Sequence, residues 1–371
     1  MIIENITIMI SRLQINHFNR LIKSLLLKAD ISIIGGYHGG NLGDMALGYS
    51  INDILRERKI RGSLQTIYNL DISPWKKNKL AIIGGGAVGY DDALKRIINI
   101  YKPDYNHVAL LGVDFKEDEY VDIEVCKLLE NSKWLSCRNE AQAIKMTKIS
   151  GRKDISFHPD LVFSYKMEFC RIHRLNLHKK KKLCINVLPI YSKLIGNKLF
   201  PLEEYRKERP ELFEKYDVMI NNYRNGVVNL AIDAINDGYE VITIPFTPED
   251  EKIAKIFFQG ISVRHVSYSD NPNKILKEMA SAEEVFATRY HATIFAIKLG
   301  AKLIPMAYAK KNEHLLEEFN VPRENYITSL DLANGLNITK KHINIDVSAV
   351  EVWEMKAFEV INKSISTLLN Q

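Results

Sequence analysis

Several patterns that mark particular classes of protein are missing from this sequence. The four cysteines among 371 residues form no CxxC pair, so we expect the reduced thiols of a cytoplasmic protein, with a disulfide pair or a metal site as the alternative. No D-x-D triplet is present, which argues against a metal-held nucleotide sugar. The glycine-rich turn after the first predicted strand has neither the Walker nor the GxGxxG spacing, so it is not one of the two commonest phosphate loops. The net charge of +6 is modest, and no basic stripe alternates with aromatic residues, so nucleic acid is not an expected partner.

Long uninterrupted apolar runs are also missing. The first 27 residues are rich in Ile and Leu but include Glu4, Arg12 and Asn16. These polar residues break what would be the core of a signal peptide or of a membrane span. We therefore expect an amphipathic helix that packs on the first domain, with a helix that lies on a membrane surface as the alternative.

The sequence does have enough patterned apolar chain for two domains. Its length exceeds the usual single core, and 46% hydrophobic with 26% charged residues is an ordinary globular composition. Strand patterns alternate with helical patterns over 30–165, which predicts a parallel, doubly wound sheet. We expect an N-terminal Rossmann-like domain (1–165), a basic linker (166–182), a second Rossmann-like domain (183–346) and a C-terminal helix (347–371). Two such α/β domains facing across a cleft would form a GT-B-like architecture.

A glycine-rich turn follows the first predicted strand at 31–34. The turn ends in Asn41-Leu42-Gly43-Asp44, and a helix with one apolar face follows it. Its glycines allow the backbone to approach a ligand closely. Asp44 at the helix start could cap the helix, orient a substrate hydroxyl or act as a base, and capping is the commonest of these roles.

Two further strand ends carry candidate site residues. The strand at 80–83 runs into Gly84-Gly85-Gly86, which predicts backbone pressed against a ligand or a neighbouring helix. The strand at 134–137 is followed by Arg138. Because the carboxyl ends of parallel strands share one edge of a sheet, we expect these residues to line one cleft.

The segment from Ala287 to Thr293 predicts a buried strand, a tight turn and a buried helix that Gly300 ends. Arg289, Tyr290 and His291 would then lie where ligands bind in α/β sheets, beside a helix N-terminus that favours anions. A fixed cation and a titratable imidazole suggest a site that holds an anion and moves a proton. The alternative is that Arg289 pairs with a carboxylate and His291 caps the helix.

Three other segments give more local predictions. The basic linker, which includes Lys179 to Lys182, is predicted to be solvated, with a patch for anionic phospholipid headgroups as the alternative. The insertion over 191–211 would form a mobile lid beside the cleft. Thr247, Pro248 and Asp250 have the spacing of an N-cap, a first-turn proline and a capping-box partner.

With these segments in hand, the sequence resembles the polysaccharide pyruvyl transferase family over roughly 30–320. Asn41-Leu42-Gly43-Asp44 looks like the family's N-x-G-D turn, and Gly84-Gly85-Gly86 is similar to its glycine triplet. Arg289-Tyr290-His291-Ala292 resembles its R-x-H-A block. Weaker matches are Cys137 to Glu140, where Asn139 replaces the usual acid, and Pro159-Asp160.

The resemblance implies transfer of a pyruvyl group from phosphoenolpyruvate, the donor substrate, to a sugar of a surface polysaccharide precursor. The acceptor would be lipid-linked or nucleotide-linked. The enzyme would be cytoplasmic, and the alternative is that it also contacts a membrane through the basic linker. The resemblance implies neither a cofactor nor a metal. The family's essential residues would fall on Asp44, Arg138, Arg289 and His291. The predicted site residues are His291, Asp44 and Arg289 as catalytic groups, with substrate bound by Arg138, Asn41, Gly43, Gly85, Gly86 and Tyr290.

Two rival functions remain open at this point. One is a nucleotide-sugar glycosyltransferase of the same architecture, although the spaced glutamate pair of many retaining enzymes of that fold is not evident. The other is a non-catalytic module that binds an anion or a glycan and would tolerate loss of His291. Turnover of a nucleotide sugar would favour the first, and binding without turnover the second.

Overall fold

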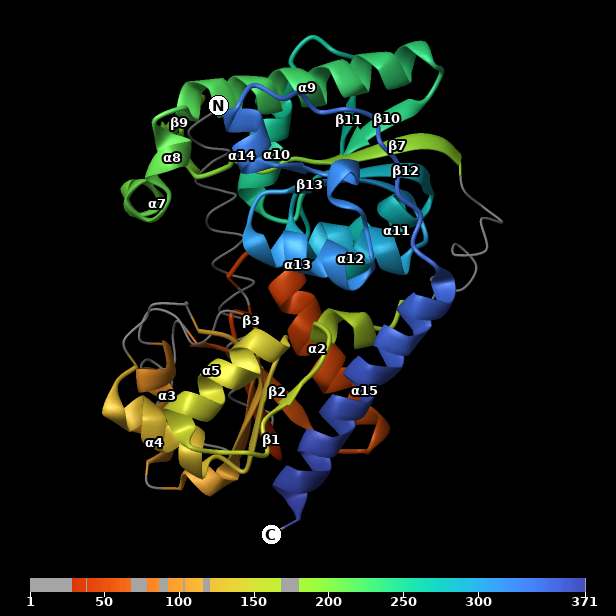
Figure 1. Ribbon diagram of the computed structural model, residues 1–371. Helices are drawn as coiled ribbons and strands as arrows, with labels where there is room; N and C mark the ends of the chain where they lie inside the picture. Colours follow the sequence, from red (N-terminus) through yellow and green to blue (C-terminus); the bar gives the residue numbers. More distant parts are fainter. Residues whose placement is uncertain are drawn as a thin grey trace, which may run out of the picture. The chain divides into compact units, whose positions relative to one another are not determined.

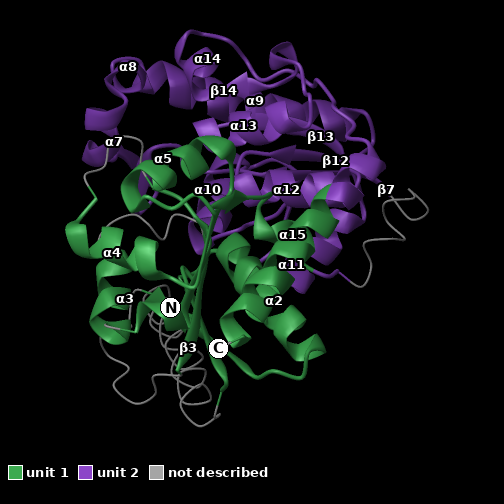
Figure 2. Ribbon diagram, turned by 60° about the horizontal axis from the view of Figure 1, so that its bottom comes forward, with its two compact units in different colours: residues 1–165, 353–371 green, residues 166–352 purple. Residues whose placement is uncertain are grey.

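A computed structural model describes residues 29–37, 39–67, 79–86, 93–102, 104–115, 121–167 and 180–370. The chain divides into two compact units, one of residues 1–165 and 353–371 and the other of residues 166–352 (Figure 2). The predicted amphipathic helix over 1–27 lies outside the described residues. None of the helices in the described ranges is both long and apolar enough to cross a membrane.

Unit 1 contains a parallel six-stranded sheet in the order β2-β1-β3-β4-β5-β6. This confirms the parallel, doubly wound sheet expected for the first domain. The fully buried β1 and β4 are runs of apolar and small residues, as parallel strands covered on both faces require. The strands are β1 (Ile31–Gly35), β2 (Gly62–Thr66), β3 (Leu80–Gly86), β4 (Val108–Val113), β5 (Trp134–Cys137) and β6 (Ser156–Phe157).

Helices cover both faces of this sheet. Figures 1 and 2 show α3 (Ala93–Tyr101) and α4 (Ile123–Asn131) on one face, with α2 (Leu42–Glu57) on the other. The predicted apolar face of α2 is buried, since none of Leu47, Ile51, Ile54 and Leu55 is more than 2% exposed. The remaining helical segments are η2 (Tyr105–His107), α5 (Glu140–Ser150) and η3 (Leu161–Ser164).

The C-terminal helix α15 (Val347–Leu369) begins at the predicted residue and ends just before the predicted bound of 371. From Trp353 onward it belongs to unit 1, where the Trp353 ring lies 5.1 Å from that of Phe163. Arg58, just after α2, donates from Nε to the Asn362 side-chain oxygen at 2.9 Å. Most of α15 therefore packs as part of the first unit.

The end of β3 shows why glycine is required there. Gly85 has φ +75°, and a Cβ at this position would lie 2.7 Å from the Leu47 Cδ1 atom of α2. The sequence predicted that the glycine triplet presses against either a ligand or a neighbouring helix, and at Gly85 the neighbour is helix α2. Tyr37 packs beside it and donates its hydroxyl hydrogen to the Gly84 carbonyl at 2.8 Å.

Replacing Gly85 with Ala is expected to lower the free energy of unfolding of unit 1 by about 2–3 kcal/mol, through the left-handed backbone and the clash with Leu47. Gly151→Ala is the matched control, because Gly151 has φ +72° with nothing within 4 Å of the added Cβ, and should cost only about 1 kcal/mol. Urea unfolding followed by tryptophan fluorescence reports unit 1, since all three tryptophans belong to it. Equal losses in the two variants would show that Leu47 does not constrain this position.

Unit 2 contains a second parallel six-stranded sheet, in the order β11-β10-β7-β12-β13-β14. Numbered along the chain this is the 3-2-1-4-5-6 order of the Rossmann fold. Together the two units are Rossmann-like α/β domains, as predicted. The strands are β7 (Lys180–Asn186), β10 (Glu240–Thr243), β11 (Arg264–His265), β12 (Ala282–Ala287), β13 (Lys302–Ala307) and β14 (Ile327–Thr328).

The helices of unit 2 also lie on both faces of their sheet. Figure 1 shows α9 (Tyr216–Asn236) on one face and α11 (Pro272–Ala280), α12 (Tyr290–Lys298) and α13 (Lys310–Glu318) on the other. The insertion contains the antiparallel pair β8 (Ser192–Ile195) and β9 (Lys198–Pro201). The other helical segments are α7 (Glu203–Glu208), α8 (Pro210–Phe213), α10 (Pro248–Phe257), η4 (Arg323–Asn325) and α14 (Ser329–Ala333).

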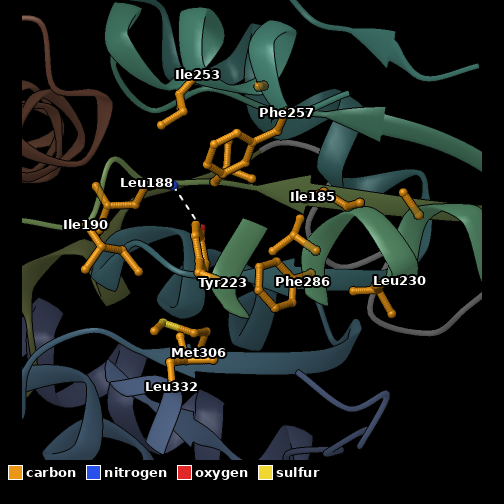
Figure 3. Packing of buried hydrophobic residues seen from close by; sticks show 14 of the residues in the cluster. Ile185, Leu188, Ile190, Tyr223, Leu230, Ile253, Phe257, Phe286, Met306 and Leu332 are labelled. Carbon is orange, nitrogen blue, oxygen red and sulfur yellow. Dashed lines mark hydrogen bonds between the residues drawn. The ribbon is translucent and has the colours of Figure 1, made fainter. Parts of the chain in front are cut away.

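A large apolar cluster between α9 and the sheet forms the core of unit 2 (Figure 3). Tyr223 of α9 is fully buried there. Its hydroxyl accepts a hydrogen bond from the Leu188 amide at 3.0 Å and lies 2.8 Å from the Thr288 hydroxyl. One buried phenol thus ties α9 to the segments that follow β7 and β12.

The prediction of a solvated linker over 166–182 is wrong for its last three residues, which belong to strand β7. β7 begins at Lys180, and Lys182 is only 5% exposed. The Lys182 ammonium donates to the Ser281 hydroxyl at 3.0 Å and lies 3.4 Å and 3.7 Å from the carboxylates of Glu240 and Glu278. It is therefore part of the buried structure of unit 2 and cannot contribute to a surface patch. Residues 168–179 lie outside the described residues.

Candidate functional site

Each sheet has a topological switch point, where connections leave to opposite sides and ligands of α/β folds bind outside the carboxyl ends of the strands. In unit 1 it lies between β1 and β3, and in unit 2 between β7 and β12. The Asn41–Asp44 turn follows β1, and Arg289 to His291 follow β12. The two motifs singled out in the sequence therefore lie at the switch points of their own units.

In unit 2 the predicted strand, turn and helix are confirmed. β12 ends at Ala287, Arg289 is the N-cap of α12, and Gly300 has φ +59° just past the last turn. Asn186, the last residue of β7, holds the turn in place. Its side-chain oxygen accepts from the Arg289 amide at 2.9 Å, while its side-chain nitrogen donates to the Ile244 carbonyl at 3.1 Å.

The Arg289 guanidinium is paired with the carboxylate of Asp250. Nε and Nη2 each donate to a different Asp250 oxygen at 2.6 Å, and Nη2 also donates to the Thr247 hydroxyl at 3.0 Å. Asp250 is 1% exposed, and its carboxylate also accepts from the Thr247 amide in the capping box of α10. The predicted capping box is confirmed, and the same carboxylate fixes the arginine.

Burial works against the charge of Arg289, but the Asp250 carboxylate outweighs it and the pKa of Arg289 is raised. The alternative that Arg289 pairs with a carboxylate is therefore confirmed, and the charge of the predicted fixed cation is balanced by Asp250. The arginine side chain is 19% exposed, and Nη1 takes part in none of the three hydrogen bonds to Asp250 and Thr247. The guanidinium is held rigidly at the start of α12.

His291 lies within the first turn of α12, since Arg289 is the N-cap and makes no side-chain capping bond. The alternative that His291 caps this helix is therefore wrong. Its half-buried ring lies 5.3 Å from the Tyr290 ring at an interplanar angle of 69°. The Lys311 ammonium lies over the rings of both Tyr290 and Tyr308, 5.5 Å and 5.4 Å from their centroids. This lysine, missed in the sequence, brings positive charge to the Tyr290 ring of the same turn.

In unit 1 the start of α2 is capped by Asn41, whose side-chain oxygen accepts from the Gly43 amide at 3.0 Å. Asp44 is thus not the cap of this helix. It lies in the first helical turn, with a carboxylate oxygen 3.4 Å from the position a Cβ on Gly36 would take. Asn41 and Gly43 shape the turn, and Asp44 presents a half-buried carboxylate near the glycine loop.

Arg138 follows β5 and lies between two carboxylates. Nε donates to Asp114 at 2.6 Å, Nη2 makes a second contact with the same oxygen, and Nη1 donates to Asp160 at 3.1 Å. Among these three side chains, two carboxylates face one guanidinium. All three guanidinium nitrogens of Arg138 are therefore in contact with a carboxylate. The Asp114 Oδ1 atom is buried and accepts no hydrogen bond.

The helix that follows Arg138, α5, has a normal N-cap although Asn139 stands where the family has an acid. Asn139 is the N-cap of α5, and its side-chain oxygen accepts from the Gln142 amide at 2.9 Å. Nearby, the buried His158 ring lies 3.1 Å from the Ser136 hydroxyl, and burial lowers its pKa. The other ring nitrogen lies 2.7 Å from the Pro159 carbonyl, so the imidazole is held from both sides.

The described residues contain no group of three or more His, Cys, Asp or Glu side chains placed to hold a metal ion. The chemistry that the described site residues offer is instead ionic and acid–base. Unit 2 offers a fixed guanidinium, a helix N-terminus and an imidazole, and unit 1 offers a carboxylate beside a glycine loop. Such groups can bind an anion and transfer protons.

Comparisons with known proteins agree with this picture. A model of the family described as polysaccharide pyruvyl transferase matches residues 41–310, and no curated protein sequence matches the chain. The UDP-GlcNAc 2-epimerase of Methanocaldococcus jannaschii has a similar fold, with a TM-score of 0.51, 11% identity, and coverage of 91% of this chain and 99% of the epimerase. Its structure with UDP-GlcNAc and UDP gives the same TM-score and coverages at 12% identity. These likenesses show a shared GT-B-like fold.

Proposed function

Because the chain belongs to the polysaccharide pyruvyl transferase family, we propose that it transfers the pyruvyl group of phosphoenolpyruvate to a sugar and releases phosphate. The acceptor is a saccharide of a surface-polysaccharide precursor, carried on a lipid or a nucleotide. The observation that supports this most is the Arg289–His291 turn, which lies at the switch point of unit 2 and within the matched residues.

The reaction forms two bonds from sugar oxygens to the second carbon of phosphoenolpyruvate and breaks the bond from that carbon to the phosphate oxygen. The two sugar hydroxyls lose their protons. One proton is gained by the methylene carbon, which becomes a methyl group, and the other leaves with phosphate. The site must therefore bind a carboxylate and a phosphate and move protons at two or more atoms.

The residues of unit 2 suit the donor. The N-terminal N–H groups of α12 favour a phosphate or a carboxylate, and the Lys311 ammonium lies close to the same turn. Arg289 would stabilise the charge that develops on the departing phosphate through its Nη1 atom, which does not donate to Asp250. His291 is the proposed general acid or base, and Tyr290 would contact the substrate. The Asp250 pair supports this role because it fixes the guanidinium before the substrate arrives.

The residues of unit 1 suit the acceptor. The Asp44 carboxylate would orient or deprotonate a sugar hydroxyl. Asn41 and Gly43 set the position of Asp44 through the helix cap, and the backbone at Gly85 and Gly86 would contact the substrate. Arg138 is proposed to contact the substrate through the small part of its side chain that is exposed, while Asp114 and Asp160 hold it in place.

We expect phosphate release from phosphoenolpyruvate that depends on an added sugar acceptor. Arg289→Lys should raise the KM for phosphoenolpyruvate about tenfold, because lysine keeps the charge but loses the planar fork. Steady-state phosphate release at several donor concentrations measures this effect.

Arg323→Lys is the control for this substitution. Arg323 pairs with Asp331 in the capping box of α14 much as Arg289 pairs with Asp250, but its side chain is exposed. An unchanged KM in Arg289→Lys would show that this arginine does not bind the donor. Turnover of a nucleotide sugar without turnover of phosphoenolpyruvate would replace the proposed function with glycosyl transfer.

A further inference from the structure

The β8–β9 hairpin of unit 2 has two faces of opposite character. Its register pairs Lys193 with Phe200 and Ile195 with Lys198, so these four side chains share one face. All four are exposed, Ile195 by 60% and Phe200 by 44%. The face therefore combines two large apolar side chains with two ammonium groups, and all four side chains point away from the core of the unit.

The opposite face holds the hairpin on unit 2. Ser192 is buried, and Leu199 packs against the core of the unit. At the base, the Tyr191 hydroxyl donates to the Tyr308 carbonyl at 2.5 Å, and the Leu202 amide donates to the Tyr191 carbonyl at 3.1 Å. The exposed face is thus presented on a firmly attached support.

The hairpin tip projects into open space. Gly196 has φ +59°, and nothing lies within 4 Å of the Cβ that it lacks. Asn197 beside it is exposed. In Figure 1 β9, α7 and α8 lie together beyond one end of α9, at the margin of the unit. The tip is therefore exposed at the margin of unit 2.

We propose that this hairpin face, defined by Lys193, Ile195, Lys198 and Phe200, docks the protein on the surface of an anionic lipid bilayer. Large apolar side chains enter the boundary between headgroups and acyl chains, and neighbouring lysines contact the anionic headgroups. The charge balance fits this surface, because residues 192–209 carry five basic and three acidic side chains. The inference goes beyond the proposed function, which a free enzyme could also perform.

A bilayer fits this face better than a protein partner does. A stable protein interface buries about 800 Å² on each side, far more than a four-residue hairpin face provides. Lysine is also depleted from the centres of protein interfaces, whereas here the two lysines alternate with the two apolar residues. Membrane contact through this hairpin does not depend on the basic linker, whose Lys182 is buried.

The test is sedimentation of the full-length protein with vesicles, without donor or acceptor, so that the result is independent of the proposed reaction. We expect binding to vesicles with half phosphatidylglycerol, weaker binding as salt rises, and little binding to pure phosphatidylcholine. Ile195→Ser with Phe200→Ser should weaken binding at least about tenfold, and Lys193→Gln with Lys198→Gln should remove the preference for anionic lipid.

Val218→Ser with Leu336→Ser is the matched control, because both residues are exposed apolar side chains of unit 2 outside the hairpin. This control should bind vesicles like the unaltered protein. Failure of the unaltered protein to bind, or equal binding by the hairpin and control variants, would overturn the proposal. So would concentration-dependent self-association that the hairpin substitutions abolish, since it would assign the face to a second copy of the chain.

Discussion

Replacing His291 with Ala should lower kcat for phosphate release from phosphoenolpyruvate by about 10²–10⁴-fold, the usual contribution of a general acid or base. The donor KM should change little, because the imidazole acts on protons and the anion is bound by other groups of the turn. The fold should survive, since His291 is only half-buried and lies in the first turn of α12, where alanine is a good helix former. Stopped or continuous phosphate assays under saturating donor measure the effect.

His314→Ala is the control for this substitution. His314 is an exposed histidine of α13 in the same unit, so its loss removes an imidazole without touching the turn after β12. We expect wild-type kcat for this variant. If His291→Ala kept more than about a tenth of the wild-type kcat, proton transfer by His291 could not be part of the mechanism.

Replacing Asp250 with Asn should lower the free energy of unfolding of unit 2 by about 3–5 kcal/mol, the usual cost of leaving a buried charge without its partner. The carboxylate accepts two hydrogen bonds from Arg289 and closes the capping box of α10. An amide of the same shape can accept from the guanidinium at one atom only and cannot balance its charge. Urea unfolding followed by circular dichroism measures the loss, as a transition without a change in tryptophan fluorescence belongs to unit 2.

The matched control is Asp331→Asn. Asp331 also closes a capping box, that of α14, and also pairs with an arginine, Arg323. The Arg323 side chain is 51% exposed, so water can solvate its charge and we expect a loss of only about 1 kcal/mol. Similar losses in Asp250→Asn and Asp331→Asn would show that burial of Arg289 adds nothing to the strength of its ion pair.

Local patterns were enough to predict the elements that carry the site. The strand, turn and helix around Arg289, the helix after Asn41 and the capping box at Thr247 each follow from residues within one turn of one another. The edge strand β2 (Gly62–Thr66) was missed because its sequence is mostly polar and its side chains are largely half-buried. A strand of that kind gives neither an apolar run nor a clear alternation.

The pairing of the site residues could not be predicted in the same way. Arg289 and Asp250 are 39 positions apart and meet because β10 and β12 both lie beside β7. Arg138 meets Asp114 and Asp160 because β4, β5 and β6 are neighbours. Strand order decides which tips lie together, and no local spacing encodes it. The sequence therefore identified the arginines, while the structure shows that carboxylates balance both of them.

The most direct test of the proposed reaction is to follow the methylene carbon of phosphoenolpyruvate into the product. The enzyme is incubated with donor labelled at that carbon and with a panel of lipid-linked and nucleotide-linked saccharides, and the products are examined by NMR. We predict a labelled methyl group on a ketal carbon attached to two sugar oxygens, together with an equal amount of phosphate. Label that stays in phosphoenolpyruvate or appears only as free pyruvate, while a nucleotide sugar is consumed, would contradict the account.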